Sequence, residues 1–138
     1  MKTNSAYLSG LIIFLICPFV MAQEEEDTEH QSSNVCVNSR TIRDFDAFTD
    51  EHIYVKEGGD DYYLFTMRGR CIGLKNSLAI AIKDTTSRVC SKSFGEVVYR
   101  DNRNRTTSCR IDTIEVVESE DDAKALVQRR KEEKDKSE

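Results

Sequence analysis

Alternation of apolar and polar residues predicts that most of this chain forms β-strands. The strongest segment runs from Tyr62 to Arg68 and reads Y-Y-L-F-T-M-R, which is rich in strand-forming residues. Both of its faces are fairly apolar, so we expect it to lie in the middle of a sheet. Residues 52–56 (H-I-Y-V-K) alternate as well. Gly58 and Gly59 lie between the two segments and predict a tight turn, so the two strands should form a hairpin.

Shorter or less regular alternation continues on both sides of this hairpin. Further strands are expected over residues 78–83, 96–100 and 107–118, with one helical turn at 74–77. Residues 41–48 predict a short strand or a turn into an extended segment, and residues 88–90 predict a brief strand or a bend. In the 78–83 strand, Leu78, Ile80 and Ile82 should share one face. The last two strands flank the turn-forming residues 101–104 and should pair as a second hairpin. The fold class is therefore mainly β, a small antiparallel barrel or twisted sheet of five to six strands over residues 35–118.

A single helix is expected after the last strand, over residues 119–130. Ser119 is suited to cap its N-terminus, with Asp122 at the capping-box position, and the acidic first turn matches the helix dipole. Its apolar stripe is narrow, so we expect weak docking. Residues 131–138 carry alternating charges and no apolar residue, and we expect them to form a disordered tail.

The first 22 residues have the pattern of a secretory signal peptide. Lys2 supplies the positive charge, an apolar stretch follows from Leu8 to Met21, and Ala22 ends a cleavage site. Lipidation at Cys17 is an alternative, although Ile16 stands where a small residue is usual. Residues 23–34 are acidic and lack apolar residues, which predicts a disordered spacer. The expected location is the periplasm or the extracellular space, with no transmembrane segment after cleavage.

Cleavage would leave four cysteines, Cys36, Cys71, Cys90 and Cys109, which in a short secreted chain predict two stapling disulfides. Three pairings are possible. We favour Cys36–Cys109 with Cys71–Cys90, because the first and last strands are neighbours when a small sheet closes. The cysteines are far apart in sequence and lack the close C-x(2–4)-C pairs of zinc sites and the C-x-x-C pair of redox sites.

Charge gives one candidate binding surface. Residues 35–118 hold 13 basic and 13 acidic residues, a balance that gives no reason to expect nucleic-acid binding. The only basic patch surrounds the second hairpin and consists of Arg100, Arg103, Arg105 and Arg110. It could bind an anionic partner or a lipid head group, or it could be a solvated hairpin tip. Asn104-Arg105-Thr106 also matches a glycosylation sequon, which matters only in a eukaryotic host.

No catalytic or ligand-binding motif is found in the chain, so we expect neither an enzyme nor a cofactor. Asp44, Asp46, Asp50 and Glu51 lack the spacing of a calcium loop, and no metal site is expected there. The favoured function is a non-enzymatic interaction or envelope-associated module whose partner is an unknown envelope protein or ligand. The alternative is a redox- or metal-responsive protein that uses its cysteines or His52.

Several short motifs, taken together, resemble a domain-of-unknown-function family of small secreted four-cysteine proteins from proteobacteria. The motifs are Cys36, Arg40-x-Ile42, Asp44-Phe45, Ile53-x-Val55, Tyr62-Tyr63-Leu64, Arg70-Cys71-x-Gly73-Leu74, Ile80-Ala81-Ile82, Arg88-Val89-Cys90, Gly95-Glu96-Val97-Val98 and Cys109-Arg110-Ile111. Ile72 departs from a proline that is common in the family, and Glu96 departs from an aspartate. The resemblance covers residues 35–117 and implies a Gram-negative envelope protein with a disulfide-bonded β domain. It implies no activity.

Overall fold

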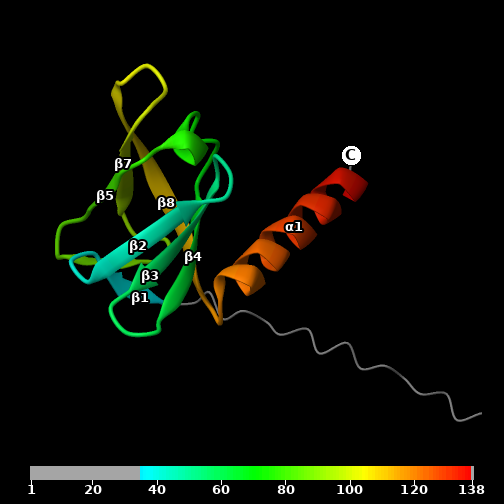
Figure 1. Cartoon of the computed structure of the whole chain (residues 1–138), viewed down its shortest axis with the longest axis horizontal. Helices are drawn as coiled ribbons and strands as arrows, with labels where there is room; N and C mark the ends of the chain where they lie inside the picture. Colours follow the sequence, from blue (N-terminus) through cyan, green and yellow to red (C-terminus); the bar gives the residue numbers. More distant parts are fainter. Residues whose placement is uncertain (1–34, 138) are drawn as a thin grey trace, which may run out of the picture.

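The computed structural model describes residues 35–137, and the expected signal peptide (1–22) and acidic spacer (23–34) lie outside this range (Figure 1). The elements in chain order are β1 (Cys36–Asn38), β2 (Ile42–Ala47), β3 (His52–Glu57), β4 (Tyr62–Met67), the 3-10 turn η1 (Leu74–Asn76), β5 (Ile80–Lys83), β6 (Arg88–Cys90), β7 (Glu96–Arg100), β8 (Thr106–Val117) and α1 (Glu120–Ser137). The expected mainly β fold with one C-terminal helix is confirmed.

Six strands form one antiparallel sheet that curls into a half-barrel, in the order β2-β3-β4-β8-β7-β5. Both expected hairpins, β3–β4 and β7–β8, are present. The β4 strand lies in the middle of the sheet and is buried on both faces, as its composition predicts. Phe65 packs into the core of the half-barrel, whereas Leu64 packs on the opposite face under α1. The strand expected over residues 78–83 begins only at Ile80, and Leu78 is 98% exposed.

A separate two-stranded ribbon, β1–β6, packs against this sheet. Its Val37 and Val89 are fully buried in the core, and they are paired across the ribbon. The Ser91 hydroxyl joins the ribbon to β8, since it donates to the Ile114 carbonyl (2.9 Å) and accepts from the Ile114 N–H (2.8 Å). Gly95 allows this close approach, because a Cβ there would lie 2.1 Å from Val89 Cγ2.

The disulfide pairing differs from the expected one. Two disulfides are formed, but Cys36 bonds Cys90 and Cys71 bonds Cys109. The expectation was wrong because β1 pairs with β6 and not with the last strand. This register places Cys36 directly opposite Cys90, with a Cα–Cα distance of 4.0 Å. The β4–β8 pairing likewise ends at Met67 and Ile111, just before Cys71 and just after Cys109.

The helix begins as expected but ends later. The Ser119 hydroxyl caps it by accepting from the Asp122 N–H (3.1 Å), and the Asp122 carboxylate reaches back to the Glu118 N–H (3.2 Å). The helix continues to Ser137, so residues 131–137 are helical and not the disordered tail that we expected. Lysine and glutamate are good helix formers even without packing, and this favours the extension. Only Ala123, Leu126 and Val127 are buried, against the outer face of the sheet.

Candidate functional site

The structure brings together three of the four arginines of the expected basic patch. Arg100, Arg103 and Arg105 lie at or beside the tip of the β7–β8 hairpin. Arg110 lies further along β8, where it faces Glu96 across the strand pair with an Nε–Oε1 distance of 3.9 Å. Arg110 is therefore not part of the cluster at the tip.

Asp101 organises the hairpin tip. Its carboxylate accepts the backbone N–H groups of Arg103 and Arg105, both at 2.9 Å, and forms an ion pair with the Arg105 guanidinium at 2.7 Å. These interactions, led by the hydrogen bond from the Arg105 backbone, lower the pKa of Asp101 below its ordinary value. Arg100 donates to the Asn104 side chain (3.0 Å). Among residues 35–137, no carboxylate forms an ion pair with Arg103, so its charge is available to a partner.

A second basic segment, residues 68–79, lies beside this tip and is held there by several bonds. The Asp50 carboxylate accepts the N–H groups of Gly73 (3.2 Å) and Lys75 (3.3 Å), and it lies 3.5 Å from Arg70 Nε. The Tyr99 hydroxyl of β7 donates to the Ile72 carbonyl at 3.2 Å. The Cys71–Cys109 disulfide then ties the segment covalently to β8.

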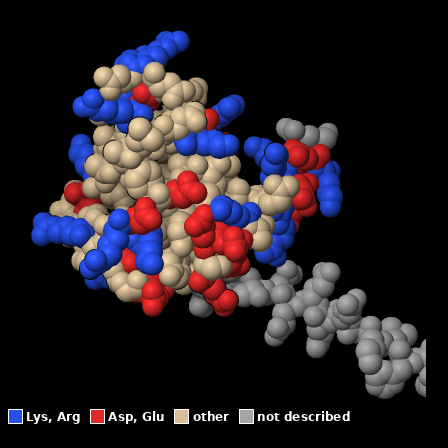
Figure 2. Space-filling view, viewed as in Figure 1, with Lys and Arg blue, Asp and Glu red and all other residues tan. Residues whose placement is uncertain are grey.

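Two apolar side chains are exposed in this segment. Ile72 is 76% exposed and Leu78 is 98% exposed. Two grooves of about 700 and 470 Å³ share Tyr99, Asp101 and Asn102, and they bring these apolar residues beside arginines. We call the surface the arginine end and define it by Arg70, Ile72, Leu78, Arg100, Arg103 and Arg105. Figure 2 shows it at the upper end of the molecule, with blue side chains around tan surface.

The arginine end is the basic pole of the sheet, and the opposite, more acidic pole also holds Arg43 and Lys56. The segments 68–79 and 99–107 contain six basic residues and one acidic residue; these are Arg68, Arg70, Lys75, Arg100, Arg103, Arg105 and Asp101. The segments 57–61 and 118–122 are purely acidic in their charges. The register places the acidic segments at the Val117 end of β8, since Tyr62 pairs with Val117, whereas Arg100 pairs with Thr106 at the other end. A strand of 12 residues separates the poles by roughly 40 Å.

A third groove, of about 530 Å³, lies between α1 and the loop before β3, and His52 lines it. The Thr49 hydroxyl accepts the N–H groups of Glu51 (3.1 Å) and His52 (3.0 Å) and lies 3.0 Å from His52 Nδ1. Since this hydroxyl already accepts twice, its own hydrogen is free for Nδ1, and His52 carries its proton on Nε2. Burial lowers the pKa of His52, and the positive charge of Arg130 lowers it further, against the opposing effect of Glu51 and Glu115.

The lowered pKa of His52 predicts a loss of stability in mild acid. The unfolded chain binds the proton at an ordinary pKa of about 6.5, whereas the folded chain resists it. The free energy of unfolding should therefore fall as the pH drops below about 6.5, and this contribution should level off below the folded pKa. Urea denaturation at a series of pH values should show a shallower decline for His52→Gln. His30→Gln is the matched control, and an equal effect of both substitutions would contradict the assignment to His52.

The cysteines and acidic residues give the redox- or metal-responsive alternative no supporting geometry. All four cysteines of residues 35–137 are bonded in pairs, and this range contains no group of three or more histidine, cysteine, aspartate or glutamate side chains that could hold a metal ion. No helix in the same range is long and apolar enough to cross a membrane.

Comparison with known proteins places the chain in a family. No curated protein and no solved structure matches it. One family model does match, over residues 5–136, and its description is a family of unknown function, DUF6491. The match includes all four paired cysteines, both hairpins and nearly all of α1. The chain therefore belongs to the family of unknown function DUF6491.

Proposed function

We propose that this protein is a non-enzymatic, envelope-associated module that docks on anionic lipid surfaces through its arginine end. The observation that carries the proposal is the exposure of Ile72 and Leu78 among arginines at the basic pole of the molecule. Exposed apolar side chains that are surrounded by basic residues are typical of surfaces that bind at a membrane interface, where they enter the headgroup region while the cations attract anionic lipids.

The polarity of the molecule supports a defined orientation on such a surface. An anionic surface attracts the arginine end and repels the acidic segments at the other end of β8. Both effects therefore turn the arginine end toward the surface. The Cys71–Cys109 disulfide and the Asp50 hydrogen bonds fix the backbone of the basic segment 68–79 in advance, which lowers the conformational entropy that is lost on binding. Two disulfides favour an oxidising compartment, which agrees with action in the periplasm or the extracellular space.

Vesicle binding tests this proposal. The chain from residue 23 onward should sediment with vesicles that contain about one-third phosphatidylglycerol but not with pure phosphatidylcholine vesicles, and added salt should weaken binding. The double substitution R103E/L78S should reduce the affinity by at least about 30-fold, because reversing one charge near an anionic surface costs about 2 kcal/mol and the apolar contact is also lost.

A matched control exists elsewhere on the molecule. R88E/F94S makes the same change of charge and also replaces an exposed large apolar side chain with serine, on another groove, where Arg88 is exposed and Phe94 is 85% exposed. This variant should retain most of the affinity. Equal losses in both variants, or equal binding to neutral vesicles, would overturn the assignment of the arginine end. Specific binding to an envelope protein without vesicle binding would overturn the lipid assignment.

A further inference from the structure

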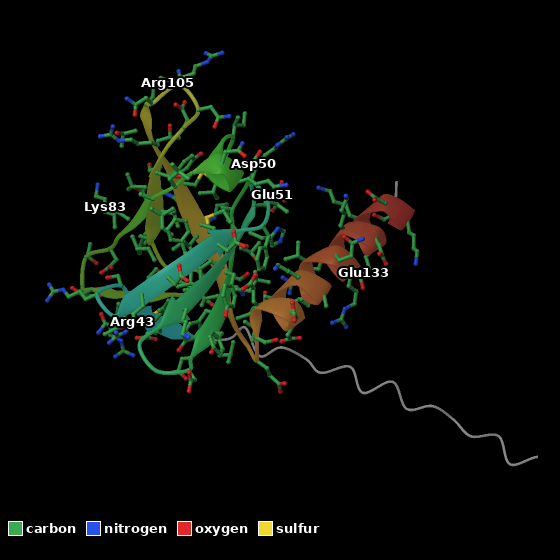
Figure 3. All side chains as sticks on the ribbon, viewed as in Figure 1. Arg43, Asp50, Glu51, Lys83, Arg105 and Glu133 are labelled. Atoms are coloured by element: carbon green, nitrogen blue, oxygen red, sulfur yellow. A yellow bond between two sulfur atoms is a disulfide. The ribbon has the colours of Figure 1, made fainter. Side chains whose placement is uncertain are left out.

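The third groove exists because α1 leaves the sheet partway along its length. The first half of the helix buries Ala123, Leu126 and Val127, and Arg130 bonds to Glu115 of the sheet. Beyond that point the helix projects away from the half-barrel, as Figure 1 shows. In Figure 3, Asp50 and Glu51 lie on the side of the half-barrel that is turned toward this projecting part. The space between α1 and this side of the half-barrel is the groove of about 530 Å³.

The groove has an apolar floor that is already in place. Phe48 lines it from the loop before β3, and Val127 lines it from α1. The Phe48 ring stacks on Tyr54, with 6.0 Å between the ring centroids, and Lys124 Nζ lies 5.4 Å from the Phe48 ring centroid. Since stacking on one side and a cation on another hold this ring, a ligand would not have to order it.

The rim of the groove is basic. Lys75, Lys131 and Lys134 line it, and within residues 35–137 none of them forms an ion pair. The carboxylate of Asp50 is occupied by Arg70 and by two backbone N–H groups. Arg130 is likewise occupied by Glu115. Glu51 is the one remaining carboxylate on the lining, against three available lysines.

We infer that this groove binds a single-chain amphiphile with a carboxylate or phosphate head. The lysines complement the charge of the head, and Phe48 and Val127 complement the apolar chain. The volume falls within the range of about 300–1,000 Å³ that is usual for small-molecule sites. His52 also lines the groove and adds a polar side chain beside the lysines. This site goes beyond the docking function proposed above. Arg70 lines both surfaces and Lys75 lies in the basic segment 68–79, but Lys131 and Lys134 on α1 belong to this groove and not to the arginine end.

Calorimetry and backbone NMR on the chain from residue 23 onward test the inference with four probes, all below micelle formation. Decanoate and decyl phosphate should bind and shift the amide signals of residues 48–52 and 127–134. Decanol, which lacks the charge, and inorganic phosphate, which lacks the chain, should each bind about tenfold more weakly or not at all. Equal binding of decanol would overturn the role of the lysines, and equal binding of phosphate would overturn the role of the apolar floor.

Two double substitutions on α1 make a matched pair. K131E/K134E reverses two charges on the groove and should weaken decanoate binding about tenfold, whereas R129E/K136E reverses two exposed charges that do not line it and should have little effect. Circular dichroism verifies that both variants keep the helix. Equal losses would overturn the site. K131E/K134E should still bind phosphatidylglycerol vesicles and R103E/L78S should still bind decanoate, so a failure of one proposal is distinguishable from a failure of the other.

Discussion

Replacing Cys71 and Cys109 together with alanine is expected to lower the free energy of unfolding by about 4 kcal/mol. In the loop-entropy model, a disulfide that closes a loop with a sequence separation of 38 lowers the entropy of the unfolded chain and so raises its free energy by about this much. Domains of this size have net stabilities of about 5–15 kcal/mol, so the loss is a large share of the total. Urea denaturation without reductant measures it. An unchanged midpoint would show that the bond contributes nothing to stability.

The Cys36–Cys90 disulfide is the control for a second prediction, which concerns vesicle binding. Cys36–Cys90 has a sequence separation of 54, so its removal should cost a similar free energy. That bond, however, staples the β1–β6 ribbon, whereas Cys71–Cys109 anchors the segment that carries Arg70 and Ile72. At a temperature where both variants remain folded, C71A/C109A should lose vesicle binding and C36A/C90A should keep it. The reverse result would show that the arginine end does not depend on its covalent anchor.

Local chemistry explains why both hairpins could be predicted from the sequence. Gly59 has a positive φ of 106°, which glycine adopts at low cost, and it lies in the turn that joins β3 to β4. Asn104 adopts a φ of 61° in the β7–β8 turn, where asparagine is among the better tolerated residues. These signals lie within a few residues of the strands they connect, so a pattern read along the chain detects them.

The disulfide pairing could not be predicted, because it depends on contacts between distant segments. Cys71 approaches Cys109 only once β4 is paired with β8, and Cys36 meets Cys90 only because β1 leaves the main sheet. Neither pairing has a local signal in the sequence. Buried Glu115 was also missed, although an acidic residue in the otherwise apolar run Ile114–Val117 indicates that a partner is required.

The candidate sites were predicted only in part for the same reason. The hairpin arginines form a cluster in sequence, so Arg100, Arg103 and Arg105 were found, but Arg70 and Ile72 come from another segment that Asp50 and Tyr99 hold in place. The third groove, between α1 and the loop before β3, was not predicted because two of its lysines, Lys131 and Lys134, lie beyond the expected end of the helix. Charged residues without an apolar stripe resemble a disordered tail, although their helix propensity is high.

Arg130→Ala is expected to lower the free energy of unfolding by about 3 kcal/mol, the second large effect. Glu115 is 3% exposed and accepts two bonds from the Arg130 guanidinium, at 2.8 and 2.6 Å. Removal of the arginine leaves a buried carboxylate without its counter-charge, which costs about 3–5 kcal/mol. We take the lower end, since the Arg130 side chain is 35% exposed and water can partly replace it. Urea denaturation of the variant measures the loss.

Three comparisons make this prediction specific to the buried pair. Arg129→Ala removes an exposed neighbouring charge and should change stability by less than about 0.5 kcal/mol. The double substitution E115L/R130M replaces both charges with apolar groups and should recover most of the loss, because no buried charge is left unpaired. In Arg130→Ala the pKa of His52 should rise, since the charge of Arg130 is one cause of its lowering. The contradicting result is that Arg130→Ala lowers the free energy of unfolding no more than Arg129→Ala does and leaves the His52 titration unchanged. The Arg130–Glu115 ion pair would then not hold α1 on the sheet, and the helix would not be a fixed side of the third groove.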